Sequence, residues 1–153
     1  MVLCNRFKKL SCACVDHNHF FHEPSRSHKY DAGADLYMPS KVVIKPGRFF
    51  KININTAVKI PKGFVGLILP RSSVSMSGIH ICTGVIDAGF TGGLMVTVYN
   101  FSCKDVELLK GNRIAQLVVV PCLLGNFVEI PFEELQKQKS DNRGACGFGS
   151  TGK

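Results

Sequence analysis

Residues 84–100 decide how this chain folds; they read GVIDAGFTGGLMVTVYN. Four glycines in the first ten residues surround one carboxylate, Asp87, and one aromatic ring, Phe90, so the backbone can turn sharply and lie close to a ligand. We interpret the stretch as a glycine-rich hairpin. Its backbone N–H and C=O groups, freed from a regular ladder, can recognise the edge of a flat polar ring, and Phe90 offers a stacking face. An ordinary hairpin with a solvated Asp87 explains this stretch alone equally well.

The segments around this hairpin have the patterns of strands. Residues 50–60 alternate apolar and polar side chains after a turn at 45–48, and residues 64–69 form the continuous apolar run of a strand buried on both sides. Other strands, separated by Gly and Asn turns, are expected near residues 10–15, after the turn at 31–37, and at 105–109, 113–124 and 127–130.

Helical signals are short. Residues 70–78 predict one or two turns of helix, with a serine as N-cap and Gly78 at the end, and residues 133–136 predict a single turn at most. Since no long amphipathic helix is present, we expect an all-β fold, a jelly-roll-like barrel.

The C-terminal segment differs in composition from the rest. It is polar and then rich in glycine, which cannot pack a core, so we expect a β domain at residues 1–136 and a flexible tail at 137–153. Phe148 stands alone in this tail, and an aromatic residue there has a role if the tail closes over a nucleobase. The other interpretation is a frayed C-terminus.

Composition excludes several classes of protein. No apolar run approaches the roughly 20 residues that cross a bilayer, and the N-terminus lacks a signal-peptide core, so we expect an intracellular protein, cytoplasmic or nuclear, without a membrane partner. The net charge is +8, but the basic residues are scattered rather than interleaved with aromatic residues, which favours a polyphosphate ligand over direct nucleic-acid binding.

The seven cysteines are an odd number without the spacing of a disulfide framework, which predicts free thiols. Residues 12–22, CACVDHNHFFH, concentrate thiols and imidazoles that could hold Zn²⁺, although the spacing matches no standard zinc site. The other interpretation is an edge strand whose Cys12 and Cys14 face the core, followed by a polar loop.

Five stretches in order resemble the five motifs of the trimeric dUTPases, the deoxyuridine triphosphate nucleotidohydrolases. They are DAGADLY at 31–37, PRSS at 70–73, the hairpin at 84–93, GNRIAQL at 111–117, and RGACGFGSTG at 143–152. Any one of them is a weak signal, but five in order across residues 31–152 are specific.

The resemblance implies hydrolysis of dUTP to dUMP and pyrophosphate, which limits uracil incorporation into DNA and supplies dUMP for thymidylate synthesis. Asp87 matches the general base that orients a water for in-line attack on the α-phosphorus, a reaction that needs positioning and electrostatic stabilisation. Mg²⁺ would supply much of the positive charge, with Asp35 holding its waters. Asp31 is interpreted as a turn residue in the same motif.

The remaining motif residues match substrate-binding positions. Arg71, Ser72, Ser73 and Gln116 match contacts to the phosphates. Gly84 begins the backbone edge that reads uracil, and Phe90 lies where an aromatic ring packs beneath deoxyribose. In the tail, Arg143, Ser150 and Thr151 match a γ-phosphate clamp, and Phe148 with Gly149 matches a lid over uracil. The family also implies a homotrimer whose active sites are shared among subunits.

Four positions depart from the family's usual residues. Phe90 is often Tyr, Gly89 is often Asp, Asn112 is often Asp, and Cys146 replaces a common glycine, which puts the closed geometry of the tail in doubt.

Two other functions are compatible with these motifs. One is a partner-binding module that has lost its chemistry, although Asp35, Arg71, Asp87, Gln116 and Arg143 are all present. The other is dCTP deamination, which the related deaminases perform with a glutamate at the position that aligns with Thr97. A threonine cannot shuttle protons in that way.

Overall fold

The computed structural model describes residues 9–137. Of these, residues 9–123 belong to one compact unit and residues 124–137 to a second. The first unit contains β1 (Cys12–Cys14), β2 (Ala34–Tyr37), β3 (Val42–Ile44), β4 (Phe49–Asn53), β5 (Thr56–Val58), β6 (Phe64–Pro70), α1 (Ser72–Met76), β7 (Ile79–Ile81), β8 (Gly84–Ile86), β9 (Met95–Asn100), β10 (Val106–Leu108) and β11 (Arg113–Pro121). The second contains α2 (Phe132–Lys137). The division predicted at residues 136 and 137 stays a prediction.

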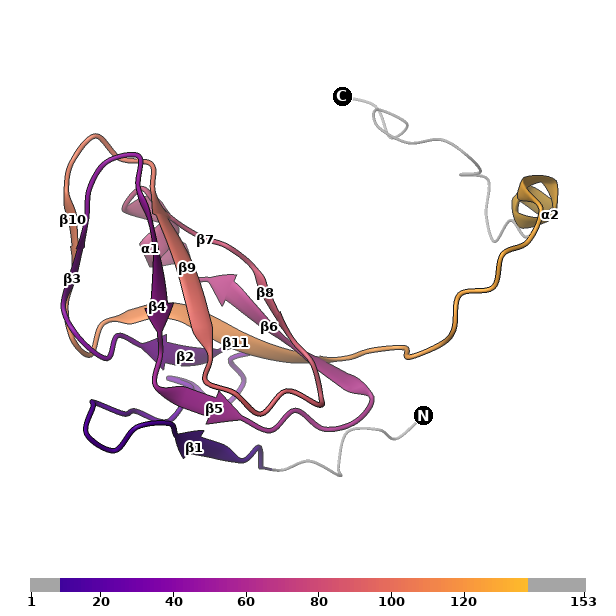
Figure 1. Cartoon of the computed structure of the whole chain (residues 1–153), viewed down its shortest axis with the longest axis horizontal. Helices are drawn as coiled ribbons and strands as arrows, with labels where there is room; N and C mark the ends of the chain where they lie inside the picture. Colours follow the sequence, from indigo (N-terminus) through magenta and orange to yellow (C-terminus); the bar gives the residue numbers. More distant parts are fainter. Residues whose placement is uncertain (1–8, 138–153) are drawn as a thin grey trace. The chain divides into compact units, whose positions relative to one another are not determined.

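The strands form antiparallel sheets that enclose one core (Figure 1). The largest sheet has the order β2-β11-β6-β8 and faces a second of order β4-β9-β7, with the pairs β1-β5 and β10-β3 beside them. Alternate side chains of these strands point inward, so the core is built from branched aliphatic residues of both sheets, including Leu36, Ile68, Leu117, Ile52, Val96 and Val98. The predicted all-β, jelly-roll-like class is confirmed.

Residues 84–100 do not form the predicted hairpin. β8 and β9 do not pair with each other, because they lie in different sheets. Among the described strands, β8 pairs with β6 alone, whereas β9 pairs with β4 and β7. The β7–β9 ladder ends with a bond of 2.9 Å from the N–H of Cys82 to the carbonyl of Thr97, after which the chain crosses to the other sheet. β8 therefore lies at the edge of its sheet (Figure 1), and within residues 9–137 no strand pairs with the outer backbone groups of β8, as the sequence predicted.

The predicted strand at 50–60 is two strands, because the chain bends at Asn55, whose φ is 59°. Asparagine tolerates this left-handed conformation better than most residues. Its buried side-chain amide donates to the carbonyls of Asp16, His19 and Phe20 at 3.0, 3.3 and 3.1 Å, and its oxygen accepts the Asp16 N–H at 2.8 Å. This asparagine fixes the Cys/His-rich segment to the barrel.

Hydrogen bonds and an ion pair within the protein hold the Cys/His-rich segment at residues 12–22. Among the described residues, no three His, Cys, Asp or Glu side chains are arranged to hold a metal ion. Asp16 pairs with His19 at 2.7 Å, and the N–H of Asn18 and the His19 ring hold the pKa of the Asp16 carboxyl below its ordinary value. Cys12 is exposed, so the expectation that it faces the core is wrong, and Cys14 is half-buried. Desolvation of its thiol, followed by the charge of Glu23, raises the pKa of Cys12 above its ordinary value.

The remaining elements follow the sequence in part. α1 is present and Gly78 follows it with φ of 81°, but its N-cap is Arg71, not a serine, and no side chain caps it. The strand predicted at 127–130 is wrong, because these residues have no regular secondary structure. Within residues 9–137, no helix is both long and apolar enough to span a membrane.

Candidate active site

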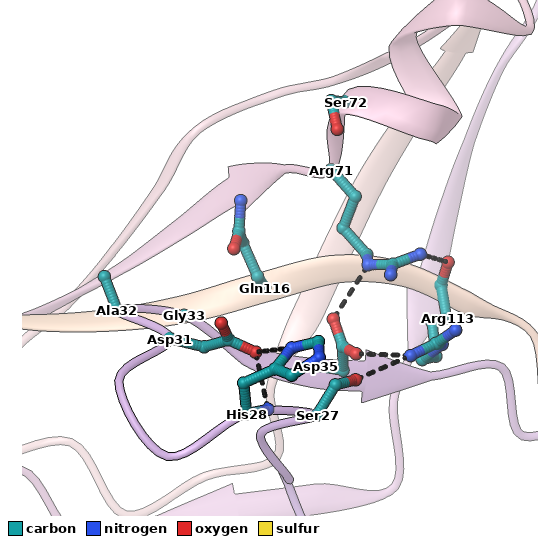
Figure 2. Close-up of a pocket in the computed structure, with 10 residues that line it drawn as sticks. All are labelled: Ser27, His28, Asp31, Ala32, Gly33, Asp35, Arg71, Ser72, Arg113 and Gln116. Carbon is teal, nitrogen blue, oxygen red and sulfur yellow. Dashed lines mark hydrogen bonds and ion pairs between the residues drawn. The ribbon is translucent and has the colours of Figure 1, made fainter.

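A polar cavity of about 500 Å³ opens where β2, β11 and the start of α1 meet (Figure 2). Its lining brings together Asp35, Arg71, Ser72 and Gln116 from three of the predicted motifs. The other lining residues are Arg113, Ser27, His28, Asp31, Ala32 and Gly33. The antiparallel pairing of β11 with both β2 and β6 produces this convergence, since it places Gln116 opposite Asp35 on one side and opposite Leu69 on the other.

Asp35 is the buried charge of this cavity, with 8% of its surface exposed. Its Oδ1 lies 2.7 Å from Nε of Arg71, and its Oδ2 lies 3.2 Å from Nη1 of Arg113 (Figure 2). Two guanidinium groups therefore share one carboxylate, which compensates for its removal from water. The predicted role of Asp35 in holding the waters of Mg²⁺ stays a prediction.

Arg71 is held in place at the junction of β6 and α1. Its Nη1 donates to the backbone carbonyl of Arg113 at 3.2 Å and to Oγ of Ser73 at 3.4 Å. Its Nη2 makes no hydrogen bond to any residue within 9–137. Ser72 lines the cavity, whereas Ser73 lies outside it and accepts a bond from Arg71.

An irregularity in β11 places two polar side chains in the cavity. The register with β2 shifts between Arg113 and Ala115, so that Ile114 and Ala115 are both buried although they are adjacent. Such a bulge re-aims the side chains on either side of it. As a result, Arg113 and Gln116 both line the cavity although they are three positions apart, which a regular strand does not allow.

The position of the Gln116 side chain requires a glycine at position 33. Its Nε2 donates to the carbonyl of Pro70 at 2.8 Å. The Gln116 side chain passes directly over Gly33, where a Cβ would overlap the amide group. Glycine at position 33 therefore leaves the space that this amide occupies.

Asp87, Gly84 and Phe90 do not line this cavity. Asp87 is exposed on the turn that follows β8, where its carbonyl accepts the N–H of Phe90 at 3.0 Å. Phe90 is 41% exposed and packs its ring over Gly92, where a Cβ would lie 2.8 Å from Cζ of the ring. Gly84 pairs with Ile68 at the sheet edge. The tail residues Arg143, Phe148, Gly149, Ser150 and Thr151, and also Cys146, lie outside the described residues.

Comparison with known proteins identifies the family. The family model for dUTPase matches residues 20–152. The chain belongs to the dUTPase family. It is similar to the deoxyuridine 5′-triphosphate nucleotidohydrolases of Rhodococcus erythropolis, with 40% identity over 84% of this chain and 78% of the relative, and of Mycobacterium marinum, with 40% identity over 84% and 86%.

Solved dUTPase structures share the fold. A mutant of the Staphylococcus bacteriophage 80alpha dUTPase with dUpNHpp aligns with a TM-score of 0.82 and 30% identity, covering 96% of this chain and 100% of that one. A mutant dUTPase from phage phi11 of S. aureus, reported with a structural Mg(II) ion, aligns with a TM-score of 0.74 and 29% identity, covering 80% and 96%.

The structure adds residues of this dUTPase that sequence reasoning missed. The sequence assigns no role to Arg113, although it lies within the fourth motif, and it does not indicate Ser27 or His28 as residues of the site. Asp31 lines the cavity and accepts the N–H of His28 at 2.8 Å, which agrees with its interpretation as a turn residue. A sequence signal for Arg113 exists only in retrospect, because polar residues flanking two adjacent apolar ones, Ile114 and Ala115, are consistent with a bulge but also with a strand end.

Proposed function

We propose that this dUTPase hydrolyses dUTP to dUMP and pyrophosphate by water attack on the α-phosphorus, with Asp87 as the general base. The observation that carries the proposal is the cavity in which Arg71, Arg113, Ser72 and Gln116 converge. Guanidinium, hydroxyl and amide donors in one hollow suit a polyphosphate chain. The dUpNHpp bound by the similar phage enzyme supports this assignment.

In this mechanism the cavity binds the leaving group. Arg71 presents Nη2 to the phosphates while Asp35 and the Arg113 carbonyl hold the rest of its guanidinium group. Fixed donors of this kind stabilise charge that develops on the departing pyrophosphate without reorganising during the reaction. The Ser72 hydroxyl and the Gln116 amide, which line the same cavity, add further donors.

The turn after β8 supplies the nucleoside site and the base. The free outer edge of β8, beginning at Gly84, can pair with the polar edge of uracil, and the half-exposed ring of Phe90 can pack under the sugar. The exposed carboxylate of Asp87 can take a proton from the attacking water.

We also infer a homotrimer in which subunits share these sites. Within one chain, the cavity of Arg71 and the turn of Asp87 are separate. Association of identical chains in a ring can bring the cavity of one subunit to the turn of the next. The tail residues Arg143, Phe148, Gly149, Ser150 and Thr151 are proposed to close over the nucleotide, as the family resemblance implies.

Mg²⁺ fits the cavity as a cation carried by the substrate. Asp31 and Asp35 are its two carboxylates, too few for an all-protein site, and the described residues include no cluster of three ligands. Magnesium usually keeps several waters and binds substrate phosphates with one or two carboxylates. When bound, it would neutralise phosphate charge, and Asp35 is the residue that would orient its waters.

The direct test is the product assay with and without metal. We expect dUTP to give dUMP and pyrophosphate with Mg²⁺, and activity to fall to background when the metal is chelated with EDTA, because the phosphate charge is then uncompensated. Chromatography that separates dUTP from dUMP measures the activity with Mg²⁺ and with EDTA, and a pyrophosphate assay measures the second product. Restoration by added Mg²⁺ is the control, and full activity in EDTA would contradict the metal's role. If this activity is found, we also propose that the protein limits uracil incorporation into DNA by removing dUTP and that it supplies dUMP. Both roles would place it inside the cell.

Substitution of Gly33 by alanine tests the phosphate side of the site. The new Cβ would displace the Gln116 amide, so we expect KM for dUTP to rise about tenfold, the worth of one hydrogen bond to a charged group. Steady-state kinetics measures KM. Gly125→Ala is the matched control, because a Cβ at Gly125 meets nothing within 4 Å. An unchanged KM in the Gly33 variant would show that Gln116 does not contact the phosphates.

A further inference from the structure

The side chain of Arg113 joins three parts of the chain that are distant in sequence. Its Nη1 lies 2.9 Å from Oγ of Ser27 and 3.2 Å from Oδ2 of Asp35, while its own residue begins β11. The bulge that follows it aims this side chain into the cavity instead of along the sheet. Because the guanidinium group is a rigid fork of donors, it can fix several acceptors at once.

Arg113 also determines how Asp35 can act on Arg71. Asp35 gives one oxygen to each arginine, so Arg71 is engaged through Nε alone and not through a bidentate pair. The carbonyl of Arg113 takes Nη1 of Arg71 at 3.2 Å. These contacts leave Nη2 of Arg71 without a hydrogen-bond partner among residues 9–137.

The charges of these three groups favour an anion. Asp35 and Arg71 alone would form a neutral pair, and a neutral pair gives a polyphosphate little attraction. With Arg113 added, one carboxylate faces two guanidinium groups, so the cluster stays positive. Loss of Arg113 would also allow the freed Oδ2 of Asp35 to take a second nitrogen of Arg71, the nitrogen that the substrate needs.

We propose that Arg113 is a positioning residue for triphosphate binding: by sharing Asp35 with Arg71, it keeps one edge of the Arg71 guanidinium open to the phosphates. The inference rests on the proposed function of the cavity. Arg113 acts through Asp35, and removal of its side chain weakens nucleotide binding more than it slows the chemical step.

The test is a double-mutant cycle between Arg113→Ala and Asp35→Asn, with kcat and KM for dUTP and the Kd of dUpNHpp measured for each protein. We expect Arg113→Ala to raise KM and Kd about tenfold, the scale of one charge-assisted contact, with kcat changed less than about threefold. In the Asp35→Asn background the same substitution should lose the part of its effect that acts through Asp35 and keep only the loss of positive charge, because neighbouring groups in one network are not additive. Arg113→Lys, which keeps the charge, should recover part of the affinity.

Arg48→Ala is the matched control. Arg48 is an exposed arginine of the β3–β4 turn and lines none of this cavity, so its loss removes the same charge and should leave KM within about twofold of the parent value. Thermal melting of every variant reports folding. If Arg113→Ala does not fold, the cycle is run with Arg113→Lys.

Three results would overturn the inference. An effect of Arg113→Ala that persists in full in the Asp35→Asn background would show that Arg113 contacts the phosphates itself. A loss of kcat without a change in Kd, or unchanged kinetics, would show that it does not position Arg71. A parent protein that neither hydrolyses dUTP nor binds dUpNHpp would instead refute the proposed function.

Discussion

Replacement of Asp87 by asparagine is expected to lower kcat for dUTP by about 10²–10⁴-fold, the usual contribution of a positioned general base. The carboxylate is exposed and its side chain makes no hydrogen bond within residues 9–137, so the change should not affect folding. Asparagine keeps the shape of the side chain but cannot accept a proton from water. The Kd of dUpNHpp and the melting temperature should therefore stay close to those of the parent protein.

Asp105→Asn is the matched control, because Asp105 is also an exposed aspartate and lies outside the cavity. It should leave kcat unchanged. If the Asp87 variant turns over dUTP nearly as fast as the parent, another group activates the water and the proposed mechanism is wrong.

The second large effect is the recovery of activity when two inactive variants are mixed. Arg71→Ala removes the guanidinium group that is proposed to bind the phosphates, and Asp87→Asn removes the proposed general base. The homotrimer of each variant should therefore be nearly inactive. If Arg71 and Asp87 of one site come from different subunits, random reassembly of an equal mixture leaves about one quarter of the sites with both wild-type residues. We therefore expect the unfolded and refolded mixture to regain about a quarter of the parent kcat per chain.

The control is the same refolding of each variant alone, which should yield no activity. Light scattering on the mixture reports whether it assembled. Trimers that form and stay inactive after mixing would show that each chain owns both residues, and the shared-site proposal would then fail.

Much of the fold could be predicted from local patterns. Apolar runs and turn residues located the strands β6, β10 and β11 and the turn at residues 45–48, because these signals depend only on neighbours in sequence. Pairing did not follow from such signals. The choice of β6 as the partner of β8, and the break at Asn55, depend on contacts with segments tens of residues away.

The site was predicted to a similar extent. The order of the motifs indicated that Asp35, Arg71 and Gln116 belong together, and the structure places them in one cavity. The pairing of Asp35 with Arg113 joins residues 78 positions apart, across a bulge that alternation cannot reveal. The third motif identifies Asp87, but Asp87 does not line the cavity of its own chain. The proposed site therefore depends on the association of subunits.

The measurement that tests the account most directly compares dUTP with dCTP as substrates. Thr97, which aligns with the glutamate of the related deaminases, lies on β9 between the buried Val96 and Val98 and opposite Lys51, with no carboxylate to move protons. The backbone edge proposed to bind uracil would meet the amino group of cytosine with unpaired donors, at a cost of about 1–3 kcal/mol each. We predict dUMP and pyrophosphate from dUTP and no ammonia from dCTP; ammonia release from dCTP at a rate near that of dUTP hydrolysis would contradict the account.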